Sequence, residues 1–194
     1  WRDLAALLDH LGVEQTALVA QSMGGRTAVP FAMMNPGRTW AIVLAGTNGG
    51  AVTDEVRLRQ DDHKASLPPG STLNDRALAP DFAGHDPAKE FLYRQINRLN
   101  PKRPRDFLAP RPGYSGSSAE RLSQSAIPIL FLAGEHDAIV PPHIAQLCHE
   151  AVAGSRFHMI AGAGHSAYFE KPAEFNAAVM EFLLAHVPGG GNRE

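Results

Sequence analysis

The stretch "VAQSMGGRTA", residues 19–28, sets the fold prediction, because a lone serine stands between an apolar run and two glycines. The run "TALVA" (16–20) has the length and apolar character of a buried strand. Residues 24–34, which follow, have helical spacing and end before Pro36. A sharp turn from strand to helix holds a serine hydroxyl away from the backbone. The stretch therefore makes Ser22 a candidate nucleophile.

Other apolar runs also have the length of buried strands, namely "AIVLA" (41–45), "IPILFLA" (127–133) and "RFHMI" (156–160). Helical patterns lie between or beside them, at residues 2–11, 142–152 and 172–186. The first strands along the chain do not alternate apolar with polar residues, which is typical of parallel strands covered on both faces. The sequence therefore predicts an α/β domain with a mostly parallel sheet flanked by helices.

The pattern breaks down over residues 50–122, which contain many prolines and only one clear helical segment, 87–99. We interpret this stretch as a helical lid or cap inserted over the sheet. The core is then formed by residues 1–49 and 123–187 together. The glycine-rich end, 188–194, is predicted to be a flexible tail.

The composition is that of one globular domain: 194 residues, of which 44% are hydrophobic and 20% charged. The formal charge of −2, without long blocks of one sign, gives no reason to expect a nucleic acid or an anionic membrane as partner. No apolar run is long enough to cross a bilayer. We therefore expect a small-molecule substrate and a cytoplasmic location, and leave the oligomeric state open.

The single cysteine, Cys148, excludes an internal disulfide and a zinc cluster of thiolates. It has helical spacing with Ile144 and Leu147, so we interpret it as a core residue. No pattern of metal ligands and no phosphate-binding glycine loop is present. The sequence therefore predicts chemistry without a metal or cofactor.

A candidate acid follows the apolar run 127–133, in "GEHDAIVPP". Asp137 ranks above its neighbours Glu135 and His136, because Gly134 and the following "VPP" place it just beyond the end of a strand. An acidic residue in such a turn is also common for purely structural reasons.

A candidate base lies in "HMIAGAGHSAYFEKP", where His165 follows the last predicted strand in a loop flanked by glycines. An imidazole in that loop can face a serine with one nitrogen and a carboxylate with the other. The chain has nine histidines, and His158, inside the predicted strand, is interpreted as half-buried and structural.

The motifs "AQSMGG", "GEHDAIVPP" and "GAGHSAYFEKPAEF" together resemble the nucleophile elbow, acid loop and histidine loop of the α/β-hydrolase fold family, in that family's chain order. The resemblance covers nearly the whole chain apart from the insertion. It implies that Ser22 is the nucleophile, His165 the general base and then acid, and Asp137 the residue that orients the imidazole. Ala20 departs from the family's usual glycine two residues before the serine.

The resemblance also implies that the chain is N-terminally incomplete and corresponds to the C-terminal half of that fold. The backbone N–H of Met23 would be one donor of the oxyanion hole, and the loop that gives the second donor would precede this chain. The strand 16–20 would then be an open edge. We expect these 194 residues alone to be poorly soluble and nearly inactive.

The function implied is hydrolysis of a carboxylic ester, lactone or related acyl compound through an acyl-enzyme. Two alternatives stay open: a C–C bond hydrolase, lyase or perhydrolase with the same triad, or a non-catalytic ligand receptor on the same scaffold. Apolar side chains of the insertion could line an acyl pocket or simply pack the lid, namely Phe82, Phe91, Tyr93 and Phe107. Arg94 and Arg98 either meet a substrate carboxylate or form a solvated basic face.

Overall fold

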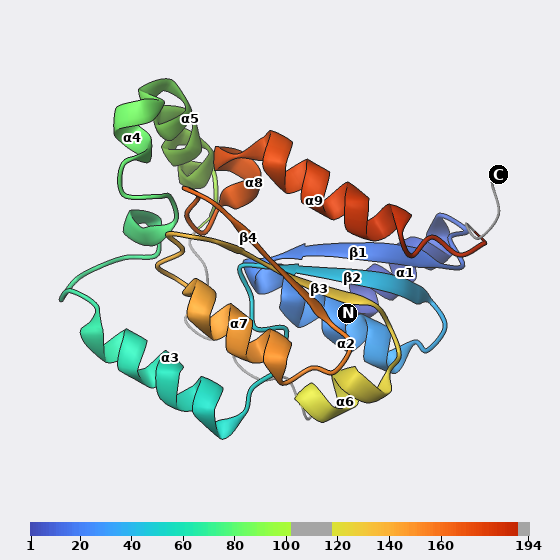
Figure 1. Cartoon of the computed structure of the whole chain (residues 1–194). Coiled ribbons are helices and arrows are strands. Elements are labelled where there is room, and N and C mark those ends of the chain that lie inside the picture. The colour runs from blue at the N-terminus through green and yellow to red at the C-terminus, as the bar shows by residue number, and fades with distance from the viewer. Residues whose placement is uncertain (102–117, 190–194) are drawn as a thin grey trace.

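A computed structural model describes residues 1–101 and 118–189 of the chain. At its centre is a sheet of parallel strands in the order β1-β2-β3-β4 (Figure 1). The strands are β1 (Thr16–Gln21), β2 (Thr39–Ala45), β3 (Ile129–Gly134) and β4 (Arg156–Ile160). The predicted parallel sheet is confirmed, and every predicted strand lies within about two residues of an observed one.

Helices cover both faces of this sheet (Figure 1). Ile42 and Leu44 of β2 pack with buried residues of α2 (Gly25–Met34) and α7 (Pro142–Glu150). The alternate residues Ala41 and Val43 pack against α9 (Pro172–Leu184) on the other face. This alternation, together with the completely buried β3, produces the continuous apolar runs of the sequence. The helix α1 (Arg2–His10) packs beside α2.

The remaining helical elements lie at the ends and sides of this arrangement. They are η1 (Ser22–Gly24), α3 (Asp54–Ser66), η2 (Asn74–Arg76), α4 (Phe82–His85), α5 (Pro87–Arg98), α6 (Ala119–Gln124) and α8 (Ala167–Glu170). Figure 1 shows α4 and α5 together beyond one end of the sheet, near α8, and α3 alongside α7. The predicted helix at 87–99 is confirmed as α5.

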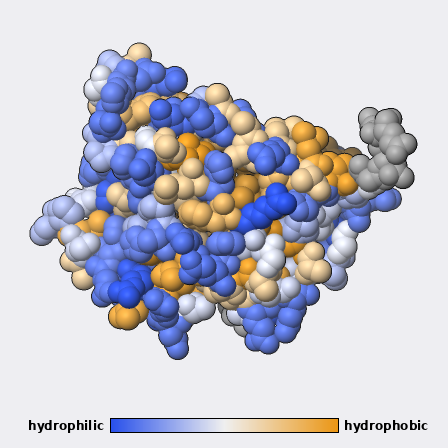
Figure 2. Space-filling view, viewed as in Figure 1, coloured by the Kyte–Doolittle hydropathy of each residue, from blue (hydrophilic) through white to orange (hydrophobic). Residues whose placement is uncertain are grey.

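No sequence pattern predicts α3, because its residues form no apolar stripe and only Val56 is buried. Its N-terminus is capped by Thr53, whose side chain accepts the Val56 N–H at 3.2 Å. Arg59 pairs with both Glu55 and Asp62 on the exposed surface. Figure 2 shows the hydrophilic surface that results over α3. Caps and exposed charges, rather than an amphipathic stripe, specify this helix.

Both ends of residues 50–122 join the core instead of standing apart from it. Ala51 and Val56 are completely buried in the cluster beneath α2 and α7, and Leu122 of α6 is 1% exposed there. The part beyond the sheet is therefore shorter than the predicted insertion, and its action as a lid stays a prediction. Phe107 and the end of the predicted tail lie outside the described residues.

Both outer strands of the described sheet are partly exposed. β1 pairs only with β2 in the described part of the chain, and Val19 is 49% exposed. In β4, Met159 is 46% exposed and only Ile160 is buried. The expectations of a buried β4 and a half-buried His158 were therefore wrong, because an edge strand is covered on fewer sides. No described helix is long and apolar enough to cross a membrane.

Candidate active site

Ser22 stands directly after β1, where the chain turns through η1 into α2. Its φ of +50° lies in the left-handed region, which non-glycine residues seldom adopt and which costs about 1–3 kcal/mol. Among the described non-glycine residues only Ala126 shares a positive φ. This strained turn presents Ser22 at the carboxyl end of the sheet, as the sequence predicts.

Of the two glycines after Ser22, Gly25 is the one that lets the following helix lie close to its surroundings. A Cβ on Gly25 would stand 2.7 Å from Thr47 Oγ1, so the contact with the loop after β2 requires glycine. A Cβ on Gly24 would meet the Ala20 Cβ at 3.7 Å, an ordinary van der Waals distance. The extra methyl group of Ala20 is therefore accommodated without displacing the helix.

Asp137 and His165 meet in a buried pair. The His165 Nδ1 lies 2.9 Å from Asp137 Oδ2 and 3.0 Å from Oδ1. The two residues are 3% and 7% exposed. Because a carboxylate oxygen accepts hydrogen bonds, Nδ1 is the donor in this pair, and Nε2 is the ring nitrogen that Asp137 does not engage. Asp137, rather than Glu135 or His136, contacts the imidazole, and those neighbours are exposed.

The Asp137 carboxylate is held by its own loop. Its Oδ1 accepts the backbone N–H groups of Ile139 and Val140, each at 2.8 Å. The loop itself is fixed to the histidine loop, because the His136 N–H donates to the Ala163 carbonyl at 2.8 Å. The carboxylate is therefore oriented independently of the imidazole that it receives.

His165 lies against the ends of β1 and β2. The Gln21 side-chain amide donates to the His165 carbonyl at 2.8 Å, and Gln21 immediately precedes Ser22. A Cβ on Gly46 would stand 2.9 Å from His165 Cε1. The structure thus brings the histidine beside the elbow. Among the described residues Ser22 and His165 share no hydrogen bond, and such bonds are often long in enzymes without substrate.

The predicted oxyanion donor, Met23, lies in the first turn of η1, directly after Ser22. Backbone N–H groups at this position have no acceptor within their own helix. The Met23 N–H is therefore placed where a helix N-terminus favours negative charge.

The predicted substrate residues occupy different surroundings. Tyr93 donates to or accepts from the Ser166 hydroxyl at 2.7 Å, next to His165. Its ring and that of the buried Phe82 both contact Phe169, at centroid distances of 5.1 and 6.4 Å. Phe91 lies two positions before Tyr93 on α5, and residues two positions apart on a helix do not share a face. Phe91 accordingly faces solvent and is 64% exposed. Phe91 therefore does not accompany Tyr93 toward the site.

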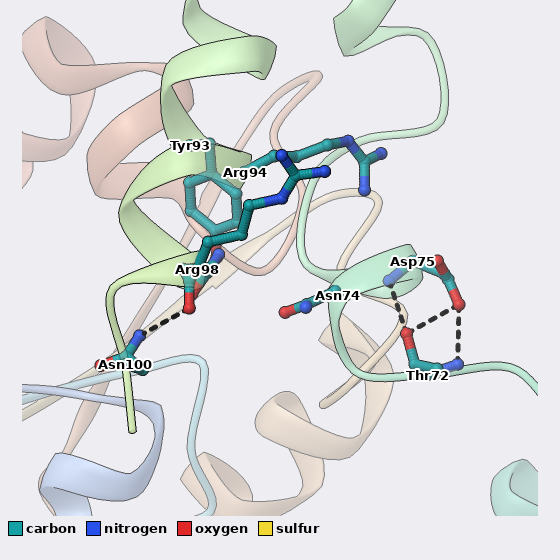
Figure 3. A pocket seen from close by; sticks show the side chains of 8 residues that line it. Thr72, Asn74, Asp75, Tyr93, Arg94, Arg98 and Asn100 are labelled. Atoms are coloured by element: carbon teal, nitrogen blue, oxygen red, sulfur yellow. Dashed lines mark hydrogen bonds between the residues drawn. The ribbon is translucent and has the colours of Figure 1, made fainter. Parts of the chain in front are cut away.

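A cavity of about 400 Å³ lies between α5 and the η2 segment. Figure 3 shows Arg94 and Arg98 extending across it from α5. Its lining residues are Thr72, Asn74, Asp75, Tyr93, Arg94, Asn97, Arg98 and Asn100. The Asp75 carboxylate accepts the N–H and hydroxyl of Thr72, and these hydrogen bonds lower its pKa. Arg94 is ion-paired with Glu90 of the same helix, whereas Arg98 donates to the neutral Gln95 amide, so Arg98 is the better placed of the two cations to receive an anion in this cavity.

Sequence reasoning missed Glu170, which is 5% exposed beside the histidine loop. Its oxygens accept the N–H groups of Ala79 at 2.7 Å and Gly164 at 3.0 Å. Burial raises the pKa of Glu170, with a smaller rise from Asp137, against the lowering effect of those hydrogen bonds. No spacing rule signals this residue, because Ala79 comes from a distant, irregular segment.

A family model described as alpha/beta hydrolase fold matches residues 2–172. The 2-hydroxy-6-oxononadienedioate/2-hydroxy-6-oxononatrienedioate hydrolase of Paraburkholderia xenovorans is 26% identical to this chain, covering 94% of it and 66% of that protein. The 2-hydroxy-6-oxo-6-phenylhexa-2,4-dienoate hydrolase of Comamonas testosteroni is 29% identical to this chain, and the match covers 94% of this chain and 67% of that protein.

Among solved structures, a thermophilic esterase from Thermogutta terrifontis with malate bound is similar at a TM-score of 0.75. It is 27% identical, and the match covers 95% of this chain and 71% of that one. The chain therefore spans about two thirds of the length of the curated relatives it matches, with 66% and 67% covered.

Proposed function

The chain belongs to the alpha/beta hydrolase fold family, and from that premise we propose that it acts as a serine hydrolase with Ser22 as nucleophile, His165 as general base and then acid, and Asp137 as the carboxylate that orients the imidazole. The observation that carries this proposal is the buried Asp137–His165 pair beside the strained turn of Ser22. Similarity to hydrolases and to an esterase supports the same class of reaction.

In the proposed reaction, His165 Nε2 removes the Ser22 hydroxyl proton as Oγ attacks the substrate carbonyl. The carbonyl oxygen becomes an oxyanion, which accepts the Met23 N–H. The tetrahedral intermediate collapses when imidazolium protonates the leaving group, and an acyl-enzyme remains. Water, deprotonated by His165, then releases the acid and restores the Ser22 hydroxyl. Asp137 stabilises the imidazolium in both halves of the cycle.

We propose further that the substrate carries a carboxylate, which Arg94 and Arg98 bind in the cavity beside Tyr93. The Arg98 guanidinium, which donates to the neutral Gln95 amide, supports this assignment, whereas at Arg94 the substrate carboxylate would compete with Glu90. The Tyr93–Ser166 hydrogen bond, which connects the cavity to the residue after His165, supports it as well. The relatives from Paraburkholderia xenovorans and Comamonas testosteroni are named for dioate and dienoate substrates, which are carboxylates.

A fluorophosphonate probe, which reacts with activated serines, tests the proposed triad. In the complete protein we expect one adduct, on Ser22, and its loss in Ser22→Ala. His165→Ala should slow labelling by at least about 100-fold, because the hydroxyl loses its base. Labelling of Ser22 at an unchanged rate in His165→Ala would contradict the triad and favour the ligand receptor.

A C–C bond hydrolase is the second candidate, favoured by the two relatives named as hydrolases of oxo-dienoates. It uses the same triad on a carbonyl beside a breaking C–C bond. Turnover of p-nitrophenyl esters, with and without a terminal carboxylate, is to be compared with that of 2-hydroxy-6-oxo-dienoates. A higher kcat/KM on the dienoates would assign the C–C reaction, and a higher value on the esters would assign the esterase.

A further inference from the structure

We propose that Glu170 is a positioning residue that ties the histidine loop to residues 77–79, and so holds His165 where it can serve Ser22. This inference rests on the proposed function. It starts from the two carboxylate oxygens of Glu170, which accept N–H groups from two separate segments. Gly164 directly precedes His165, whereas Ala79 lies between η2 and α4.

Residues 77–79 also bind the residue on the other side of His165, Ser166. The Ser166 N–H donates to the Ala77 carbonyl at 2.9 Å. Both neighbours of His165 are therefore fixed to the same short segment, Ser166 directly and Gly164 through Glu170. The backbone of His165 cannot shift without breaking one of these connections.

Gly164 packs so closely against residues 78–79 that there is no room for a side chain between the two backbones. A Cβ there would stand 2.4 Å from the Ala79 nitrogen and 2.5 Å from the Leu78 carbonyl carbon. The two backbones are thus in direct contact, and both N–H groups are buried with Glu170 as their acceptor. Leaving a buried N–H without an acceptor costs about 1–3 kcal/mol.

The preceding part of the same segment holds the acid loop. The Ala138 carbonyl accepts hydrogen bonds from Arg76 and His63, each at 3.0 Å. Ala138 follows Asp137 directly. One continuous stretch, residues 63–79, therefore contacts the loops of both Asp137 and His165. Glu170 supplies the side-chain connection to the histidine loop.

The main test compares Glu170→Gln with Glu174→Gln, an exposed carboxylate four residues further along. Glutamine keeps one acceptor oxygen and turns an amide NH₂ toward the other N–H, so one of the two contacts is lost. We expect kcat of Glu170→Gln to fall about 10- to 100-fold with KM nearly unchanged, because a displaced base affects the transition state more than binding. Glu174→Gln should retain the wild-type kcat.

A double-mutant cycle with His165→Ala separates positioning from general damage. If Glu170 acts through His165, Glu170→Gln should not slow fluorophosphonate labelling further in the His165→Ala background. Equal slowing in both backgrounds, or an unchanged kcat in Glu170→Gln, would overturn the proposal.

Amide hydrogen exchange gives a measurement that does not depend on catalysis. In Glu170→Gln or Glu170→Asp, exchange should accelerate at Ala79 and at 164–166, with distant strands unchanged. Unchanged protection there would overturn the proposal, even if hydrolase activity is absent. If the fluorophosphonate probe does not label Ser22 in the wild-type protein, that result would instead contradict the proposed function alone.

Discussion

His165 directs Nδ1 at both oxygens of Asp137, whose side chain has no exposed surface at all. A carboxylate in such a place needs partners for its charge. It receives them from the imidazole and from the N–H groups of Ile139 and Val140. The pair is therefore arranged as the proposed mechanism requires, with a carboxylate that can stabilise an imidazolium.

Asp137→Asn should reduce kcat by about 10³–10⁴-fold, because the amide favours the histidine tautomer that cannot accept a proton at Nε2. Steady-state kinetics on an ester at neutral pH measures the loss. Glu135→Gln is the control, since this exposed neighbour keeps an acceptor for the Gly162 N–H and should retain activity. Similar losses in the two variants would contradict the assignment of the acid.

Gly46→Ala should lower kcat, because its Cβ would stand 2.9 Å from the His165 imidazole. Gly12→Ala is the matched control: its φ of +66° resembles the +56° of Gly46, but its Cβ meets nothing within 4 Å. Both variants should lose about 1 kcal/mol of stability from the backbone conformation. Only Gly46→Ala should lose activity, and equal kcat values would refute the placement of the ring.

Gly25→Ala should destabilise the protein by about 1–3 kcal/mol through overpacking against Thr47. Gly24→Ala, whose Cβ makes only an ordinary contact with Ala20, should be nearly neutral or stabilising. Urea unfolding of both variants gives the comparison. A larger loss in Gly24→Ala would mean that the helix after the elbow packs differently.

Cys148 is completely buried, and burial raises the pKa of its thiol to about 12. Because the thiolate is the reactive form, the native protein should resist iodoacetamide at pH 8 and react at this position only when unfolded in urea. Mass spectrometry of the alkylated peptide measures both states. Rapid alkylation of the folded protein would contradict the core assignment.

Glu170 gives a pH dependence of stability. Its pKa is raised from the ordinary 4.5 in the folded protein, so the folded state binds this proton more tightly than the unfolded state. The free energy of unfolding of the wild type, relative to Glu170→Gln, should therefore fall as pH rises from about 4.5 through the raised pKa, and then level off. Urea unfolding at several pH values measures this, and a rising difference would contradict it.

The strands and the site loops could be predicted because each leaves a local trace in the sequence. A strand buried on both faces reads as a continuous apolar run, as in "AIVLA". Glycines mark the turns that carry Ser22 and His165, since close approach and positive φ exclude larger residues.

The contacts between segments far apart in the sequence could not be predicted, because no local pattern marks them. Glu170 meets Ala79 from 91 positions along the chain, and Tyr93 meets Ser166 from 73. Irregular backbone between η2 and α4 has no periodicity from which such a meeting could be inferred. The helix α3 could not be predicted for a related reason, because its sequence is mostly charged and polar and has no apolar stripe.

The hydrogen bonds from residues 63–79 to the acid and histidine loops bear on protein engineering. Chimeras that exchange α4 and α5 between homologues have a natural splice point after Ala79 and not before His63. A donor segment grafted from α4 onward would bring its own pocket wall. The recipient would keep residues 63–79 and their hydrogen bonds to the acid and histidine loops.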